Sequence, residues 1–146
     1  MLNKIILASK SRVRKDILDN NNIPNEVKPS NVDEDQVKDS LVKENVTPEI
    51  ISKNLAELKA NKISLKESDR FVLGADSIID LEGELISKPT DREEAFLILK
   101  KLNGKKHYLI SSVCISKNGS MIWNHTDKAI LTMKKFSDND LKIYLS

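Results

Sequence analysis

The apolar and polar positions at the start of the chain predict a strand followed by a helix. Residues 3–8 form a short apolar run, which is typical of a buried strand. Ser9 or Ser11 could cap a helix that ends near Asn21, because Pro24 prevents its continuation. The apolar residues of this helix fall on one face: Val13, Ile17 and Leu18.

Three further elements are predicted before the next apolar run. Residues 25–28 form a short strand, and a helix covers about 34–44 after a loop. Thr47 and Pro48 then open a longer helix, since threonine caps helices and proline suits the first helical position. Residues at helical spacing define one face of that helix: Ile51, Leu55, Leu58, Lys62 and Leu65.

The second half begins with a continuous apolar run at residues 71–75, as in a strand covered on both faces. Asp76 interrupts this run, which resumes at residues 78–79. A Glu-Gly turn at 82–83 then predicts a hairpin into a short strand at 84–86.

A helix and a hairpin follow in the last third of the chain. Thr90 is predicted to cap a helix at residues 91–102, and an Asn-Gly turn joins strands at 107–116 and 120–133. Ser137 opens a last helix. Together the elements predict an α/β fold with a mixed, partly antiparallel sheet flanked by helices.

Length and composition favour a single globular domain over residues 1–146, since this length can bury one hydrophobic core. The chain has no apolar run of about 18 residues, so no membrane partner is predicted. The lone cysteine, Cys114, excludes a disulfide framework and favours a reducing, cytoplasmic setting. Its position predicts a core residue of a strand.

Basic and acidic residues are nearly balanced. Lysine and arginine total 24 and aspartate and glutamate 22, and each half of the chain has one more basic than acidic residue. A nucleic-acid partner is therefore not predicted, because such binders concentrate positive charge. Arginine is scarce beside lysine, and its planar fork suits phosphate better than an ammonium does.

Ser9, Ser11 and Arg14 are candidate phosphate ligands, because they lie where the first strand passes into the first helix. A helix N-terminus offers free backbone amides and the positive end of the helix dipole. Hydroxyls and a guanidinium add directional donors. The alternative is an ordinary capped helix with solvated cations.

Asp76 is a carboxylate within an apolar strand, where burial is costly unless the group is paired, protonated or bound to a cation. Ligands of α/β sheets gather at the carboxyl ends of strands. Asp76 could therefore hold a divalent metal or accept a proton from water. The alternative is a turn aspartate that hydrogen-bonds to nearby backbone.

Two lysines and an acidic segment complete the candidates. Lys59 on the long helix and Lys88 after the first hairpin could each neutralise phosphate charge, although most lysines are solvated surface groups. Asp33, Glu34 and Asp35 could help to bind a metal, although acidic residues in loops are usually solvated.

Several short motifs occur in a fixed order along essentially the whole chain. They are Leu7-Ala8-Ser9-x-Ser11-x-x-Arg14, Val32-Asp33-Glu34, Leu55-Ala56-x-x-Lys59-Ala60, Gly74-Ala75-Asp76-Ser77, Lys88-Pro89-x-Asp91 and Leu102-Asn103-Gly104-x-x-His107. In this order they resemble the Maf family of nucleoside triphosphate pyrophosphatases, once described as septum-formation inhibitors. The resemblance implies a fold related to that of the inosine-triphosphate pyrophosphatases.

The resemblance also implies metal-dependent hydrolysis of a canonical or modified nucleoside triphosphate to a monophosphate and pyrophosphate. Asp76 would be the proton acceptor, and Mg²⁺ or Mn²⁺ would lie near Asp76 and Glu34. The resemblance assigns phosphate binding to five residues: Ser9, Ser11, Arg14, Lys59 and Lys88. Because members of the family often pair, it further implies a homodimer.

The sequence departs from the family pattern at three places. Arg12 stands where proline is usual, and Val13 stands where an arginine helps to choose the base. Ser77 stands where one branch has threonine, so Val13 and Ser77 are the candidate specificity residues. The family continues past the last helix, so we expect this chain to lack the C-terminal segment. An alternative function is a non-catalytic nucleotide-binding or cell-division regulatory protein.

Overall fold

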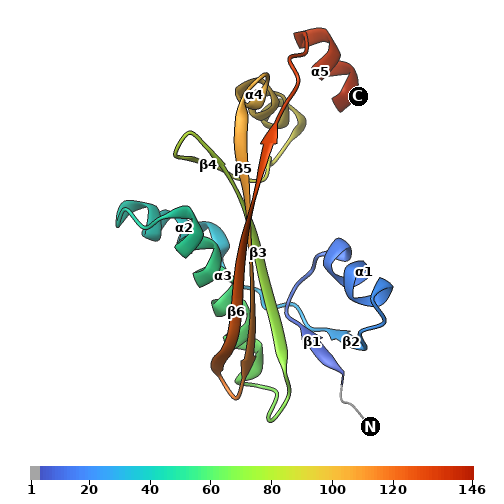
Figure 1. Cartoon of the computed structure of the whole chain (residues 1–146), viewed down its shortest axis with the longest axis vertical. Helices are drawn as coiled ribbons and strands as arrows, with labels where there is room; N and C mark the ends of the chain where they lie inside the picture. The colour runs from blue at the N-terminus through green and yellow to red at the C-terminus, as the bar shows by residue number, and fades with distance from the viewer. Residues whose placement is uncertain (1–3) are drawn as a thin grey trace. The chain divides into compact units, whose positions relative to one another are not determined.

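The computed structural model describes residues 4–146, and it confirms the predicted α/β fold with a mixed sheet (Figure 1). The strands are β1 (Ile5–Leu7), β2 (Asn25–Val27), β3 (Val72–Leu81), β4 (Glu84–Ile86), β5 (Lys106–Lys117) and β6 (Ser120–Thr132). The sheet has the order β2-β1-β3-β5-β6, and β4 pairs with β3. β1 is parallel to β2 and β3, whereas β4 is antiparallel to β3.

The chain divides into two compact units. Unit 1 comprises the chain through Ser77 together with Ser111–Asp127, and unit 2 comprises Ile78–Ile110 and Lys128–Ser146. β3, β5 and β6 contribute residues to both units. The helices of unit 1 are α1 (Arg12–Asn20), α2 (Glu34–Lys43) and α3 (Pro48–Ser64). Those of unit 2 are α4 (Arg92–Leu102) and α5 (Asp138–Leu145).

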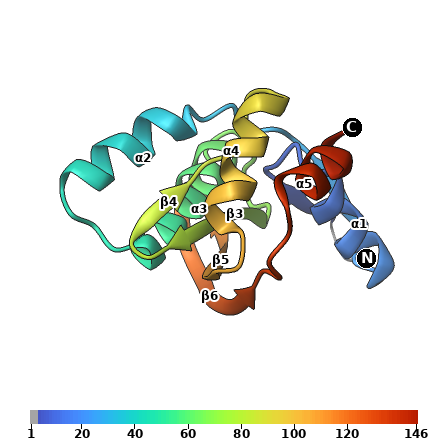
Figure 2. The same cartoon turned by 90° about the horizontal axis from the view of Figure 1, so that it is seen from above.

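Side-chain caps fix where the helices of unit 1 begin. Ser11, Asp33 and Thr47 each accept a hydrogen bond from the backbone N–H three residues further on. Each bond satisfies one of the amides that a helix leaves free in its first turn. The predicted starts of all three helices are therefore confirmed. α2 contacts α3 and lies farther from the strands than α3 does (Figures 1 and 2).

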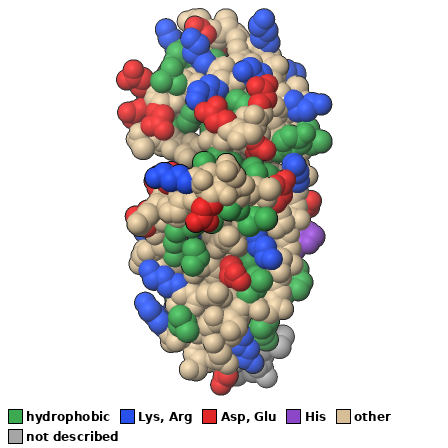
Figure 3. Space-filling model, turned by 90° about the vertical axis from the view of Figure 1, so that its left-hand side faces the viewer, with side chains coloured by type: hydrophobic (Ala, Val, Ile, Leu, Met, Phe, Trp, Pro, Cys, Tyr) green, Lys and Arg blue, Asp and Glu red, His purple; other side chains and the backbone are tan. Residues whose placement is uncertain are grey.

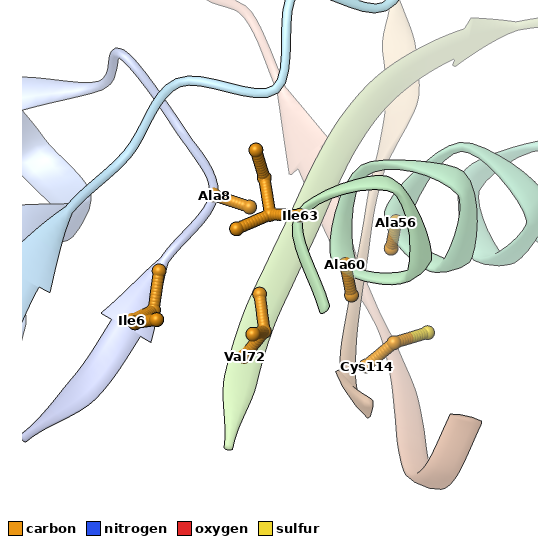
Figure 4. Packing of buried hydrophobic residues seen from close by; sticks show 7 residues of the cluster. All are labelled: Ile6, Ala8, Ala56, Ala60, Ile63, Val72 and Cys114. Atoms are coloured by element: carbon orange, nitrogen blue, oxygen red, sulfur yellow. The ribbon is translucent and has the colours of Figure 1, made fainter. Parts of the chain in front are cut away.

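The core of unit 1 forms where α3 packs on β1, β3 and β5. Its buried cluster consists of Ile6, Ala8, Ala56, Ala60, Ile63, Val72 and Cys114 (Figure 4). Cys114 is fully buried, as predicted for a strand core residue. A Cβ on Gly74 of β3 would lie 2.2 Å from the backbone oxygen of Ala56. The helix and the strand are therefore in direct backbone contact, which only glycine at position 74 permits.

This close approach corrects the predicted face of α3. Leu58 and Leu65 were predicted to share one face with Ile51, but they are 42% and 73% exposed. The buried face instead consists of Ile51, Ser52, Leu55, Ala56, Lys59, Ala60, Ile63 and Ser64. Four small residues at four-residue intervals, Ser52, Ala56, Ala60 and Ser64, run along this face. At Ala56 and Ala60, which lie against Gly74, larger side chains would hold the helix away from the strand.

The predicted apolar face of α1 is also only partly buried. Leu18 is packed into unit 1, whereas Val13 and Ile17 are 68% and 56% exposed. Both exposed residues lie one turn apart on the same side of the helix. They line a cavity rather than the core.

Unit 2 has its own small core around Leu81, Ile86 and Leu102. The Glu82-Gly83 turn has positive φ at both positions, 52° and 91°, and returns the chain into β4 as predicted. The cap of α4 corrects the prediction, because Asp91 Oδ1 accepts from Glu94 N at 2.7 Å. Thr90 instead donates from Oγ1 to the Glu94 carboxylate at 2.6 Å.

The charged surface agrees with the balanced composition. Basic and acidic side chains are interspersed over the face shown in Figure 3. Within residues 4–146 no helix has both the length and the apolar character needed to cross a membrane.

Candidate active site

The junction of β1 and α1 ties three predicted phosphate ligands together. Ser11 Oγ caps α1 by accepting from Arg14 N at 3.2 Å. Ser9 Oγ accepts from Ser11 N at 3.1 Å and from Arg14 Nη1 at 3.2 Å. These bonds hold the Arg14 guanidinium beside the helix N-terminus, where an anion meets both the guanidinium and free amides.

Asp76, the predicted proton acceptor, belongs to a buried cluster of charged side chains. Asp76 in β3 is 3% exposed and Lys59 in α3 is 5% exposed. Lys59 Nζ lies 3.3 Å from Asp76 Oδ1 and 2.5 Å from Glu34 Oε1, and it donates to the backbone oxygen of Ala75 at 3.1 Å. Because an ammonium has three protons, these three acceptors satisfy it completely. The solvated-lysine alternative is therefore wrong for Lys59.

Asp76 is only half satisfied in this cluster. Its Oδ2 is buried without a hydrogen-bond partner among the described residues. Burial raises the pKa of Asp76 above its ordinary value, while the positive charges of Lys59 and Lys38 oppose this increase. Ser52 Oγ donates to the Asp76 backbone oxygen at 3.2 Å and fixes this part of β3. The turn-aspartate alternative fails, because Asp76 lies within a strand and contacts a buried lysine.

A cavity of about 370 Å³ brings the two groups together. Ser11 and Arg14 line it from α1, and Asp76 lines it from β3. This volume is within the range of small-molecule sites, about 300–1,000 Å³. The cavity thus combines a cationic, hydroxyl-rich side with a carboxylate whose buried Oδ2 has no hydrogen-bond partner among the described residues.

The remaining lining of the cavity is apolar or carries hydroxyls. Val13 and Ile17 contribute aliphatic side chains from α1. Ser77 and Ser111 contribute hydroxyls that lie 3.1 Å apart, one from β3 and one from β5. Sequence reasoning placed Val13, Ile17 and Leu18 on one face of the helix and did not identify Ser111. The four-residue spacing of Val13 and Ile17 indicates that both side chains lie on one side of the helix, where they can line a common surface.

The carboxylates near Lys59 include the two predicted metal ligands, Asp76 and Glu34. Asp76 and Glu34 both contact Lys59 Nζ, so they lie on the same side of α3. Among residues 4–146 no three His, Cys, Asp or Glu side chains form a group that could hold a metal by themselves. Asp33, a further acidic candidate, caps α2 by accepting from Gln36 N at 3.1 Å. Two carboxylates suit Mg²⁺, which usually completes its shell with substrate phosphates and water.

Lys88 belongs to the other compact unit. It is exposed and lies in unit 2, between β4 and α4. The other predicted site residues all belong to unit 1: Ser9, Ser11, Val13, Arg14, Glu34, Lys59, Asp76 and Ser77. The structure therefore gathers the predicted residues into unit 1 except for Lys88.

Comparisons with known proteins agree on one family. A family model of Maf-like proteins matches residues 4–146. The nucleoside triphosphate pyrophosphatase of Pelagibacter ubique is 70% identical over 145 residues, which cover 99% of this chain and 74% of that protein. The nucleoside triphosphate pyrophosphatase of Ruegeria pomeroyi is 39% identical over 142 residues, covering 97% and 71%.

Solved structures confirm the predicted fold relationship. A HAM1 protein from Coxiella burnetii matches with a TM-score of 0.55 at 12% identity, covering 88% of this chain and 71% of that one. A nucleoside-triphosphatase, or dITP/XTP pyrophosphatase, from Mycobacterium abscessus matches with a TM-score of 0.51 at 12% identity, covering 89% and 74%. At this identity the matches show a shared fold alone.

Proposed function

Because this chain belongs to the family of Maf-like proteins, we propose that it hydrolyses a nucleoside triphosphate to a nucleoside monophosphate and pyrophosphate. The names of its relatives support this activity. One observation carries the proposal: the buried Asp76, whose Oδ2 has no hydrogen-bond partner within residues 4–146, lines the same cavity as Ser11 and Arg14.

Asp76 is the proton acceptor in this proposal. A water oxygen forms a bond to the α-phosphorus while the bond from that phosphorus to the α–β bridging oxygen breaks. Pyrophosphate leaves, and the water proton passes to Asp76 Oδ2 and then to solvent. Burial supports this role, because it raises the pKa of Asp76 and so strengthens the carboxylate as a base.

The cations and hydroxyls hold the phosphates. Ser9, Ser11 and Arg14 supply donors at the N-terminus of α1, and Lys59 supplies a buried positive charge beside Asp76. Lys88 remains a proposed phosphate ligand on the strength of its motif. Phosphoryl transfer depends mainly on positioning and on neutralising spread charge, which suits such a donor set.

Asp76 and Glu34 would hold a divalent cation, Mg²⁺ or Mn²⁺. Their convergence on Lys59 and the unpartnered Oδ2 of Asp76 support this assignment. When bound, such a cation neutralises phosphate charge and stabilises the leaving group.

Val13 and Ser77 are proposed to influence which base is accepted. Both line the cavity, Val13 from α1 and Ser77 from β3. Val13 offers an aliphatic surface and Ser77 a hydroxyl that both donates and accepts. We further propose a cytoplasmic location and pairing of two copies, as the family resemblance implies.

The test is a panel of canonical and modified nucleoside triphosphates, with pyrophosphate detection in Mg²⁺ and in Mn²⁺. We expect pyrophosphate from at least one of them, and a loss of about 10²–10⁴-fold in Asp76→Asn. Full activity of that variant would remove Asp76 from the mechanism. Binding of a triphosphate without turnover by the folded wild-type chain would favour the non-catalytic alternative.

A further inference from the structure

The first turn of helix α2 contacts a buried residue of α3. The helix has no buried residue, yet Glu34 at its start contacts the buried Lys59 at 2.5 Å. Asp33 caps the same end of the helix. The face of α2 that carries Glu34 is therefore fixed toward the Lys59–Asp76 pair, although the helix lies outside α3 (Figure 2).

Lys38 lies on this face. It follows Glu34 by four residues, so the two side chains project from the same side of the helix, one turn apart. Lys38 is half-buried, whereas Lys43 in the last turn is exposed. Its charge also reaches the site, because it opposes the burial-induced rise in the pKa of Asp76.

The charges of the site leave a role for a further cation. Two carboxylates, Asp76 and Glu34, share the single ammonium of Lys59. A triphosphate adds several negative charges, and phosphoryl transfer requires that these be neutralised. Among residues 4–146 no hydrogen bond or ion pair engages the Lys38 ammonium, so it is available to a ligand.

We propose that Lys38 is a further substrate-binding residue, which contacts a phosphate oxygen of the nucleoside triphosphate from α2. This inference rests on the proposed function and adds α2 to the substrate site. The alternative is that Lys38 only offsets the two carboxylates and never touches the substrate.

Binding measurements test the proposed role of Lys38. The probes are inorganic tripolyphosphate and a non-hydrolysable analogue, with a methylene between the α- and β-phosphates, of the triphosphate that the wild-type chain hydrolyses fastest. We expect Lys38→Met to weaken binding of both probes by about tenfold or more, since a bond between charged groups contributes about 1.5–3 kcal/mol. Lys38→Arg should restore most of the affinity, because it keeps the charge and the donor.

Lys43→Met is the matched control, since it removes a lysine from the same helix at an exposed position. It should bind both probes as the wild-type chain does. Unchanged affinity in Lys38→Met, with pyrophosphate release retained by the wild-type chain, would overturn the inference and leave the proposed function intact. A wild-type chain that neither binds nor hydrolyses any triphosphate would overturn both.

Discussion

Lys59 Nζ lies 3.3 Å from Asp76 Oδ1, and both side chains are almost completely buried, one on a helix and the other on a strand. The pair therefore links the core packing of unit 1 to its candidate chemistry. The same contact that satisfies the lysine leaves the other carboxylate oxygen, Oδ2, directed at no partner among the described residues. Changing both residues together is therefore expected to separate stability from activity.

Removing Lys59 should destabilise the fold and strongly reduce activity. Lys59→Met leaves the Asp76 carboxylate buried without its cation, which typically costs about 3–5 kcal/mol. The double variant Lys59→Met/Asp76→Asn should recover much of this loss, because no unpaired charge remains. Denaturant unfolding at neutral pH measures both variants. A double variant no more stable than Lys59→Met would show that the lysine acts through packing alone.

The activity should fall at acidic pH as Asp76 becomes protonated. Burial raises the pKa of Asp76 above its ordinary value of 3.8, so the acid limb of kcat/KM should lie above that pH. Lys59 lowers the pKa of Asp76, so any residual activity of Lys59→Met should show this limb at still higher pH. The measurement is a pH profile of pyrophosphate release. A limb at or below 3.8 would contradict the environment described for Asp76.

The raised pKa of Asp76 also makes the free energy of unfolding depend on pH. Because the pKa is raised in the folded state, the folded chain binds more protons than the unfolded chain between 3.8 and the folded pKa. Asp76 therefore lowers the free energy of unfolding as the pH rises through this window. Asp76→Asn should lack this dependence, which unfolding at matched pH values for the two chains will show.

The sequence predicted the elements better than it predicted their buried faces. Caps and turns are local, so Ser11, Thr47 and the Asn-Gly turn marked their boundaries correctly. Which face of α3 is buried depends instead on how closely the helix approaches β3. Gly74 sets that distance, because it lies against Ala56 and Ala60 of the helix. Nothing in the sequence near these alanines indicates that Gly74 is their neighbour.

In the candidate site, too, local sequence indicated some residues, whereas the role of others depends on contacts with distant elements. Asp76 could be identified because a charge within an apolar run requires a reason. Lys59 could not be separated from surface lysines by pattern, since its burial depends on Ala75 and Asp76 from a different element. The motif order identified it, and the contacts now supply the physical reason. Lys38 belongs to none of the sequence motifs, and only the position of α2 in the structure identifies it as a candidate.

Cys114 should be inert toward alkylation in the folded chain. The thiol is fully buried, and burial raises its pKa to about 11. Since the thiolate is the reactive form, iodoacetamide at pH 8 should modify the native chain at least about 100-fold more slowly than the unfolded chain. Mass spectrometry gives an unambiguous result, because Cys114 is the lone cysteine. Rapid native modification would show that the α3–β5 packing opens readily.

Gly74→Ala should be among the most destabilising single-methyl additions in unit 1. The new Cβ would lie 2.2 Å from the Ala56 oxygen and 2.8 Å from the Ala60 nitrogen, both backbone atoms that cannot rotate away. The helix would have to move from β3, at a cost of about 3 kcal/mol or more. Because Lys59 lies on the same helix, its contact with Asp76 should weaken, and pyrophosphate release should fall with stability.

Gly83→Ala provides the matched control, because a Cβ there meets nothing within 4 Å and only the positive φ of 91° opposes it. That conformational strain should cost about 1–2 kcal/mol. Denaturant unfolding of the two variants therefore separates a clash from a backbone preference. Equal losses of unfolding free energy in the two variants would mean that α3 and β3 do not pack as closely as the Gly74 geometry requires. The placement of Lys59 beside Asp76 would then need another explanation.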